Sequence, residues 1–277
     1  MKKLLLLATL LTVSAFSGFT SQAKTEDLSL MTFNLRGKET DEPGDFSWAS
    51  RKKGCLKAID KFGPDVICLQ EAYGYHKADL MKEFKKYTLV DRSSKPGTVE
   101  PEITNNENPI MFRADKFELL DYGSILFNEF KNTTWVKLRY KKSGVIFFCF
   151  NTQFDERDAD LRKSSEIVAD KVKEIAGDDA VVFIGGDFKM SASDRAMAPL
   201  VSYVKDANFS LKHPDTRASF NGLGKPGDAP LWPDHILCRN ASVESYEVVD
   251  SKKYGPKYIS DHYPIYAEFE IPVPKGK

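Results

Sequence analysis

Short apolar runs recur along the chain, separated by polar, glycine-rich or proline-rich segments. Runs of this length, bounded by turn residues, are typical of buried strands. The strands predicted in this way cover residues 28–33, 66–69, 110–112, 135–138, 145–150, 181–184, 236–237 and 265–271.

Longer segments with apolar residues at helical spacing lie between these strands. They predict helices at residues 50–62 and 159–176, each followed by a glycine that can end a helix, and a shorter helix at 77–84. Helices inserted among many strands favour an α/β protein in which helices cover layered sheets.

The chain shows no internal repeat, low-complexity tract or inter-domain linker. Its 277 residues are 42% hydrophobic and 12% aromatic, which is ample for a buried core and argues against disorder. We therefore expect one domain, covering residues 24–277.

The first 23 residues have the pattern of a signal peptide. Met1-Lys2-Lys3 is a short basic start, residues 4–13 are almost entirely apolar, and Ser21-Gln22-Ala23 offers small residues for cleavage. The apolar run is shorter than the roughly 20 residues that span a bilayer. We expect cleavage after Ala23 and export to the periplasm or the medium, with no transmembrane anchor afterwards; an uncleaved anchor is the alternative.

Charge and cysteine content narrow the function further. The whole chain has 40 basic and 40 acidic residues, and loss of residues 1–23 leaves 38 basic against 40 acidic. A near-neutral domain gives no strong signal for binding duplex nucleic acid. The four cysteines are widely spaced, so the sequence indicates neither a zinc site nor a disulfide framework, and we expect buried free thiols, with a disulfide as the alternative: Cys55, Cys68, Cys149 and Cys238. We also expect a monomer.

Polar side chains follow several of the predicted strands. Asn34, Glu71 and Asp187 each come directly after an apolar run, and Asp234 and Asp261-His262 follow later. Any one of them has a simple explanation as a cap or turn residue. Together, converging oxygen atoms on strand ends suit a hard cation such as Mg²⁺.

Four motifs that occur in order give this arrangement a family resemblance. They are Met31-Thr32-Phe33-Asn34-Leu35-Arg36, Leu69-Gln70-Glu71-Ala72, Gly186-Asp187-Phe188 and Ser260-Asp261-His262-Tyr263-Pro264. With these motifs the chain resembles the endonuclease/exonuclease/phosphatase superfamily over residues 28–271. The resemblance implies a four-layer α/β sandwich, in which two facing mixed or antiparallel sheets are flanked by helices.

The resemblance also implies a metal site. Glu71 would be the principal metal carboxylate, Asn34 would lie beside it and also contact substrate, and Asp261 would contribute directly or through water. The implied cofactor is Mg²⁺ or Mn²⁺.

The catalytic residues implied by the resemblance are His262, Asp187 and Asp234. The imidazole of His262 would contact the phosphate, with Asp234 as the acid that orients it. Asp187 would position or deprotonate the attacking water.

Two positions depart from the family pattern. Gln153 stands where the family usually has histidine, and Lys189 stands where it usually has asparagine. Both would face substrate. The Lys189 ammonium could bind phosphate as a fixed cation, could obstruct the site by repelling a metal and lowering the basicity of Asp187, or could point into solvent.

We therefore expect a metal-dependent hydrolase of a phosphate ester, either a phosphodiester or a phosphomonoester, with a small-molecule, lipid-linked or nucleotide substrate. Metal-assisted in-line attack of water on phosphorus is the implied reaction. The alternative is a catalytically impaired protein that binds a phosphate ligand on the same fold, because of Gln153 and Lys189.

A more distant alternative is a sugar-binding or interaction module built on tryptophan side chains. Trp135 is expected in the core, whereas Trp48 and Trp232 could line a pocket. His76 and His213 match no motif and are expected on the surface.

Overall fold

The structure is a computed structural model that describes residues 24–38, 44–92, 94–99, 108–126, 132–155, 161–229 and 231–274. The predicted signal peptide, residues 1–23, lies outside the described residues. Within the described part of the chain, no helix is long and apolar enough to cross a membrane.

Two six-stranded sheets form the centre of the molecule. One has the strand order β11-β12-β1-β2-β4-β3 and the other the order β5-β6-β7-β8-β10-β9. The first contains β1 (Thr25–Asn34), β2 (Val66–Gln70), β3 (Tyr87–Val90), β4 (Ile110–Arg113), β11 (Ser242–Val248) and β12 (Ile265–Pro272). The second contains β5 (Phe117–Leu126), β6 (Asn132–Tyr140), β7 (Ile146–Gln153), β8 (Val181–Asp187), β9 (Lys205–Asp206) and β10 (Asp234–Arg239).

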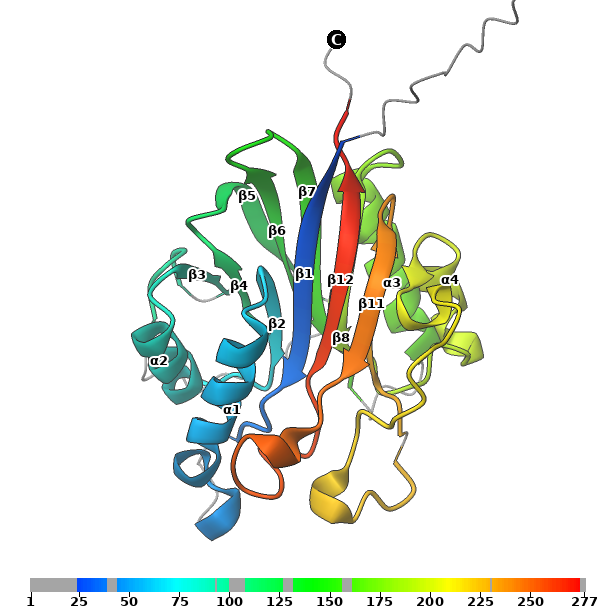
Figure 1. The fold of residues 1–277 in the computed structure, drawn as a ribbon. Helices are drawn as coiled ribbons and strands as arrows, with labels where there is room; N and C mark the ends of the chain where they lie inside the picture. The colour runs from blue at the N-terminus through cyan, green and yellow to red at the C-terminus, as the bar shows by residue number, and fades with distance from the viewer. Residues whose placement is uncertain are drawn as a thin grey trace, which may run out of the picture.

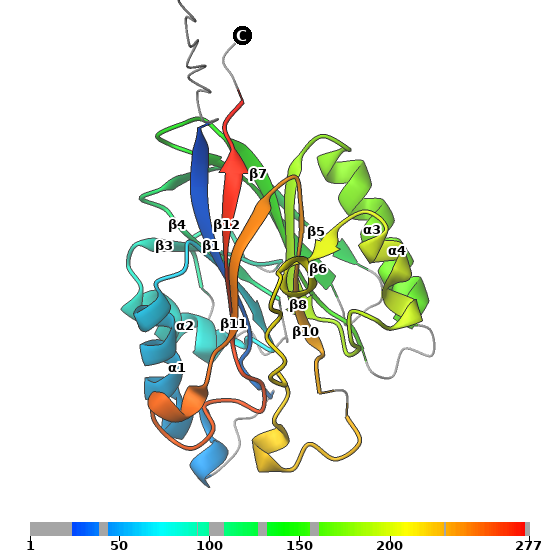
Figure 2. The same ribbon diagram turned by 45° about the vertical axis from the view of Figure 1, so that its right-hand side comes forward.

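Each sheet has one parallel strand pair among antiparallel neighbours. The parallel pairs are β1–β2 and β7–β8, and each is connected through a helix. Helix α1 (Trp48–Phe62) joins the first pair and α3 (Leu161–Ala176) joins the second, while α2 (Gly74–Glu83) and α4 (Ala198–Val201) add to the same two outer layers. Figures 1 and 2 show α1 and α2 on one side of the sheets and α3 and α4 on the other.

Three apolar clusters hold the four layers together. The central cluster lies between the sheets, and the outer two pack one sheet against α1 and α2 and the other against α3 and α4. The sheets approach closely at Gly185, where a Cβ atom would lie only 2.8 Å from the Sγ atom of Cys68. The four-layer sandwich implied by the family resemblance is therefore confirmed.

The eight strands and three helices predicted from the sequence all coincide with elements of the structure. The four cysteines are free and buried, as expected. The surface position expected for His76 is wrong, whereas His213 is exposed as expected.

His76 is fully buried because it lies on the inward face of α2. Its ring centroid lies 4.4 Å from that of Trp48, and its Nδ1 accepts a hydrogen bond from the backbone N–H of Tyr73 at 3.2 Å. Burial, with a smaller contribution from the Arg51 cation, lowers the pKa of His76 to about 3. Trp48 is also buried, and its indole N–H donates to Asp79, so Trp48 belongs to the core instead of lining a pocket.

Candidate active site

The parallel strand pairs of both sheets end on the same side of the sandwich, at the lower end of Figure 1. Asn34, the last residue of β1, pairs with Gln70, the last residue of β2, and Glu71 is the next residue after β2. In the second sheet, Asp187 at the end of β8 lies opposite both Gln153 of β7 and Asp234 of β10. Strand pairing therefore fixes the positions of most of the predicted site residues before any side-chain contact is considered.

Two amide side chains join the carboxylates of the two sheets. Asn34 Nδ2 donates to Glu71 Oε1 at 3.1 Å and to Asp187 Oδ2 at 3.0 Å. Gln153 Nε2 donates to the same two oxygens at 2.9 and 3.3 Å. Gln153 thus supplies a neutral donor that holds both carboxylates. The side-chain Oδ1 of Asn34 accepts from the backbone N–H of Arg36 at 2.9 Å.

Lys189 reaches into the site and does not point into solvent. Its Nζ lies 2.7 Å from Asp187 Oδ2, with the lysine side chain 19% exposed and the aspartate side chain fully buried. Burial disfavours the charged forms of both Lys189 and Asp187. The attraction between the ammonium and the carboxylate outweighs this effect of burial, so the pKa of Lys189 lies above its usual value and the pKa of Asp187 lies below its usual value.

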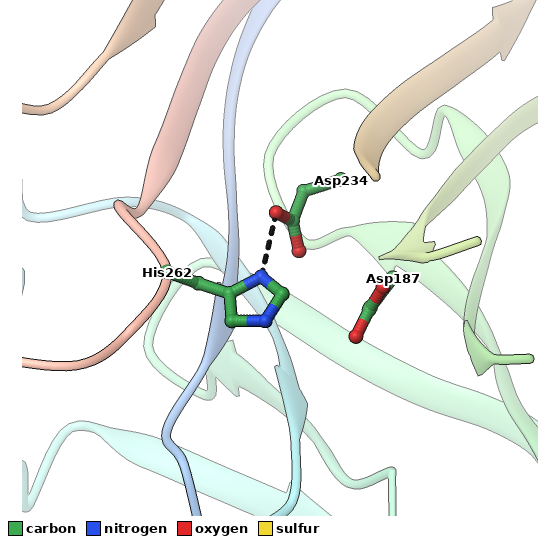
Figure 3. Close-up of side chains that lie close together, drawn as sticks. All are labelled: Asp187, Asp234 and His262. Carbon is green, nitrogen blue, oxygen red and sulfur yellow. Dashed lines mark hydrogen bonds and ion pairs between the residues drawn. The ribbon is translucent and has the colours of Figure 1, made fainter. Parts of the chain in front are cut away.

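His262 lies between two carboxylates. Its Nδ1 is bonded to Asp234 Oδ2 at 2.8 Å, and its other ring nitrogen lies on the side that faces Asp187 (Figure 3). Burial favours the neutral ring, but the charge and hydrogen bond of Asp234, with Asp187 and Asp261 nearby, raise the pKa of His262 to about 10. The ring of Phe220 packs edge-on against the imidazole, with the centroids 4.9 Å apart.

Asp261 forms a close ion pair that the sequence did not predict. Arg36 Nη1 lies 2.6 Å from Asp261 Oδ2. The hydroxyl of Ser260 donates to the backbone carbonyl of Asn34 at 2.7 Å and to Asp261 Oδ1 at 3.2 Å. These contacts tie the segment that carries Asp261 and His262 to the end of β1.

The chain turns sharply after three of the strands. Arg36, Glu71 and Lys189 have positive φ values of 54°, 54° and 58°. Such values are uncommon for residues with a Cβ atom and are often found at functional sites. Gly37 is required here, because a Cβ atom at this position would lie 1.9 Å from the carbonyl oxygen of Glu71.

Arg51 of α1 holds together the backbone segments that carry the site residues. Its fully buried guanidinium donates to the carbonyl oxygens of Phe46, Leu35, Arg36 and Ile259 at 2.7–3.0 Å. It therefore fixes the chain just after Asn34 and just before Ser260. A signal for it exists in the sequence, because Arg51 falls on the same helical stripe as the buried Cys55, Ala58 and Ile59.

Among the predicted metal residues, Glu71 is the best suited to bind a hard divalent cation. Its Oε1 takes both amide hydrogen bonds, and its Oε2 accepts none from the described residues. Mg²⁺ and Mn²⁺ prefer such oxygen donors. Asp261 would be the second metal carboxylate, although in this structure it is paired with Arg36.

The most compact group of acidic and histidine side chains in the site does not contain the predicted metal carboxylates. Asp187, Asp234 and His262 have potential ligand atoms within 4.8 Å of one another, and this group includes neither Glu71 nor Asp261. Both carboxylates of this cluster already have a partner, since Asp234 Oδ2 is bonded to His262 Nδ1 at 2.8 Å and Asp187 Oδ2 lies 2.7 Å from the Lys189 ammonium. The raised pKa of His262 favours the protonated ring beside them.

Comparisons with known proteins identify the family and the fold. The sequence profile of the Endonuclease/Exonuclease/phosphatase family matches residues 31–262. An uncharacterised protein of Acanthamoeba polyphaga mimivirus is 23% identical, covering 88% of this chain and all of the viral protein. Both sequences therefore span nearly the same domain.

Two solved structures share the fold. An endonuclease/exonuclease/phosphatase from Bacteroides vulgatus has a TM-score of 0.75 and 23% identity, covering 89% of this chain and 99% of that one. A mannosyl-6-phosphatase of Bacteroides thetaiotaomicron has a TM-score of 0.75 and 20% identity, covering 87% and 99%. The superfamily consists of phosphoesterases and nucleases that generally use divalent metals. The profile match over most of the sequence shows that this chain belongs to the endonuclease/exonuclease/phosphatase family.

Proposed function

We propose that this protein is an exported, Mg²⁺- or Mn²⁺-dependent hydrolase of a small-molecule phosphate ester. The observation that carries the proposal is the group formed by Asp187, His262 and Asp234, with the Lys189 ammonium 2.7 Å from Asp187. It places one carboxylate, suited to water, beside two cations, suited to phosphoryl oxygens. Similarity to a mannosyl-6-phosphatase supports a phosphomonoester, and the near-neutral charge favours a small substrate over duplex DNA.

In the proposed reaction the protein mainly positions charge. His262, held by Asp234, and Lys189 stabilise the negative charge that develops on the phosphoryl oxygens. Asp187 accepts a hydrogen bond from the attacking water and takes its proton as the new oxygen–phosphorus bond forms. The bond between phosphorus and the ester oxygen breaks, the alkoxide leaves with the bonding electrons and takes up a proton from solvent, and Asp187 returns the proton that it accepted to solvent.

Glu71, which takes a hydrogen bond from both amides, would hold the metal together with Asp261. A bound divalent cation there would screen the charge of the phosphate and of the leaving oxygen. Asn34 and Gln153 keep Glu71 and Asp187 at a fixed separation, because each amide donates to both carboxylates.

A panel of phosphomonoesters and phosphodiesters tests the proposal. Hydrolysis, followed as phosphate release from the monoesters and as alcohol release from the diesters, should require Mg²⁺ or Mn²⁺, should stop with a chelator and should be lost in Asp187→Asn. Tyr122→Ala, a change at an exposed side chain on β5, is the matched control. If no ester is hydrolysed with either metal, the proposed hydrolase function is wrong.

A second candidate function follows from the ion pair between Lys189 and Asp187. Because this pair opposes proton acceptance by Asp187, the same site could bind a phosphate ligand without hydrolysing it. A protein that binds inorganic phosphate in calorimetry but releases none from the ester panel would support this reading.

A further inference from the structure

A cavity of about 320 Å³ lies beside the active site, at the open edge of the sandwich. Its lining includes Phe209, Trp232, Asp234, His235, Tyr246 and Val248, so it is bounded by β10 of one sheet and β11 of the other. Asp234, whose carboxylate holds His262, is part of its wall, whereas Asp187 and His262 are not. The cavity therefore shares one wall residue with the reaction centre.

Two aromatic side chains of the cavity are unusually exposed. Trp232 is 44% exposed and Phe209 is 64% exposed, although most large apolar side chains of this protein are buried. Exposed aromatic rings beside a pocket provide flat surfaces on which a ligand ring can stack. Their position next to Asp234 points to a ligand that also reaches the phosphate site.

Each acidic residue of the cavity already has a basic side chain as its partner. Asp206 is bonded to the His235 ring at 3.0 Å, and Asp215 is bonded to the Arg217 guanidinium, with Nε 2.9 Å from Oδ1. Asp234 is similarly bonded to His262 at 2.8 Å. A neutral ligand group is therefore favoured over a second phosphate or a cation, because neither would find an unpaired charge there.

We propose that this cavity binds a neutral ring in the alcohol part of the phosphate ester, with that ring stacked on Trp232. The inference rests on the proposed function, since it assigns the substrate's phosphate to His262 and Lys189. The volume lies at the lower end of the range for ligand pockets, which suits one ring system and its substituents. The substrate class is thus a phosphate ester of a ring-bearing alcohol.

Two esters whose alcohols have similar acidity, benzyl phosphate and ethyl phosphate, isolate the contribution of the ring. In Trp232→Ala, kcat/KM for benzyl phosphate should fall about tenfold or more, while kcat/KM for ethyl phosphate stays within about twofold. Trp232→Phe should retain most of the preference. Tyr122→Ala is the control, because Tyr122 is 43% exposed on β5, outside the cavity. An equal loss on both esters would overturn the proposal and assign Trp232 to the support of Asp234.

A binding measurement keeps the inference testable without turnover. Benzylphosphonate should bind the parent protein about tenfold more tightly than methylphosphonate in calorimetry, and Trp232→Ala should remove that difference. Equal affinities of the parent for the two phosphonates would overturn the ring site. If neither ester is hydrolysed but the difference in affinity is present, the proposed hydrolysis fails and the ring site stands.

Discussion

Replacing Lys189 with asparagine removes the cation next to Asp187 with little change to the backbone. Lys189 has a φ of 58°, a conformation that asparagine adopts more readily than lysine does. The variant should therefore fold at least as well as the parent as far as the backbone is concerned. Asp187 would keep its hydrogen bonds from Asn34 and Gln153.

The size of the effect follows from the contact that is lost. The Lys189 side chain is 19% exposed and points at a fully buried carboxylate, so its charge is poorly screened by solvent. A hydrogen bond between charged groups contributes about 1.5–3 kcal/mol. If this ammonium contacts the phosphate in the transition state, kcat/KM should fall about 10- to 100-fold in Lys189→Asn.

The assay is steady-state hydrolysis of the best ester from the panel, at saturating Mg²⁺, with Lys189→Arg as the variant that keeps the charge. Thermal unfolding of all three proteins checks that they are folded. A rise in kcat/KM and in Mg²⁺ affinity in Lys189→Asn would refute the phosphate contact and show that Lys189 obstructs the site. Unchanged rate and affinity would refute both roles.

Three further predictions concern other contacts of the structure. Glu71→Gln should weaken Mg²⁺ or Mn²⁺ binding at least tenfold in calorimetry, since the carboxylate charge is lost; equal affinity would exclude Glu71 as the metal ligand. Asp234→Asn and His262→Ala should each lower turnover, and the double variant should lose less than the product of the two, because the pair acts as one unit; multiplicative losses would contradict this. The fully buried Lys77–Asp91 ion pair, 2.7 Å apart, predicts acid sensitivity. Burial opposes the charge of Asp91, but Lys77 holds the pKa of Asp91 below its usual value. The stability that the ion pair contributes is therefore present above the usual pKa of aspartate and is lost as the pH falls through the lowered folded-state pKa. Urea unfolding between pH 6 and pH 3 should show a steeper loss in the parent than in Asp91→Asn, and equal slopes would contradict the assignment.

The place of three site residues at strand ends could be predicted from the sequence because each directly follows an apolar run. Asn34, Glu71 and Asp187 are placed by strand pairing, and parallel pairs bring strand ends to one edge. The strands β9 and β11 are absent from the sequence prediction. β9 has two residues, and β11 has few buried positions, so neither produces a clear hydrophobic pattern.

Contacts between distant polar residues could not be predicted in the same way. Arg36 lies inside a recognised motif, yet its ion pair with Asp261 depends on how the loop before β12 folds back over β1. Arg51 and His76 are polar residues on buried helix faces, and their burial is accommodated by carbonyl groups and aromatic rings supplied by other segments. The burial of such a polar residue can be recognised only once the folded structure shows which segments pack against it.

Hydrolysis in water enriched in ¹⁸O tests the central claim most directly. With Mg²⁺ present, mass spectrometry of the products should show one ¹⁸O atom in each phosphate released and none in the alcohol, since water attacks phosphorus and the bond between phosphorus and the ester oxygen breaks. Asp187→Asn should abolish this labelled phosphate. Label in the alcohol, or the same yield of labelled phosphate from Asp187→Asn, would contradict the account.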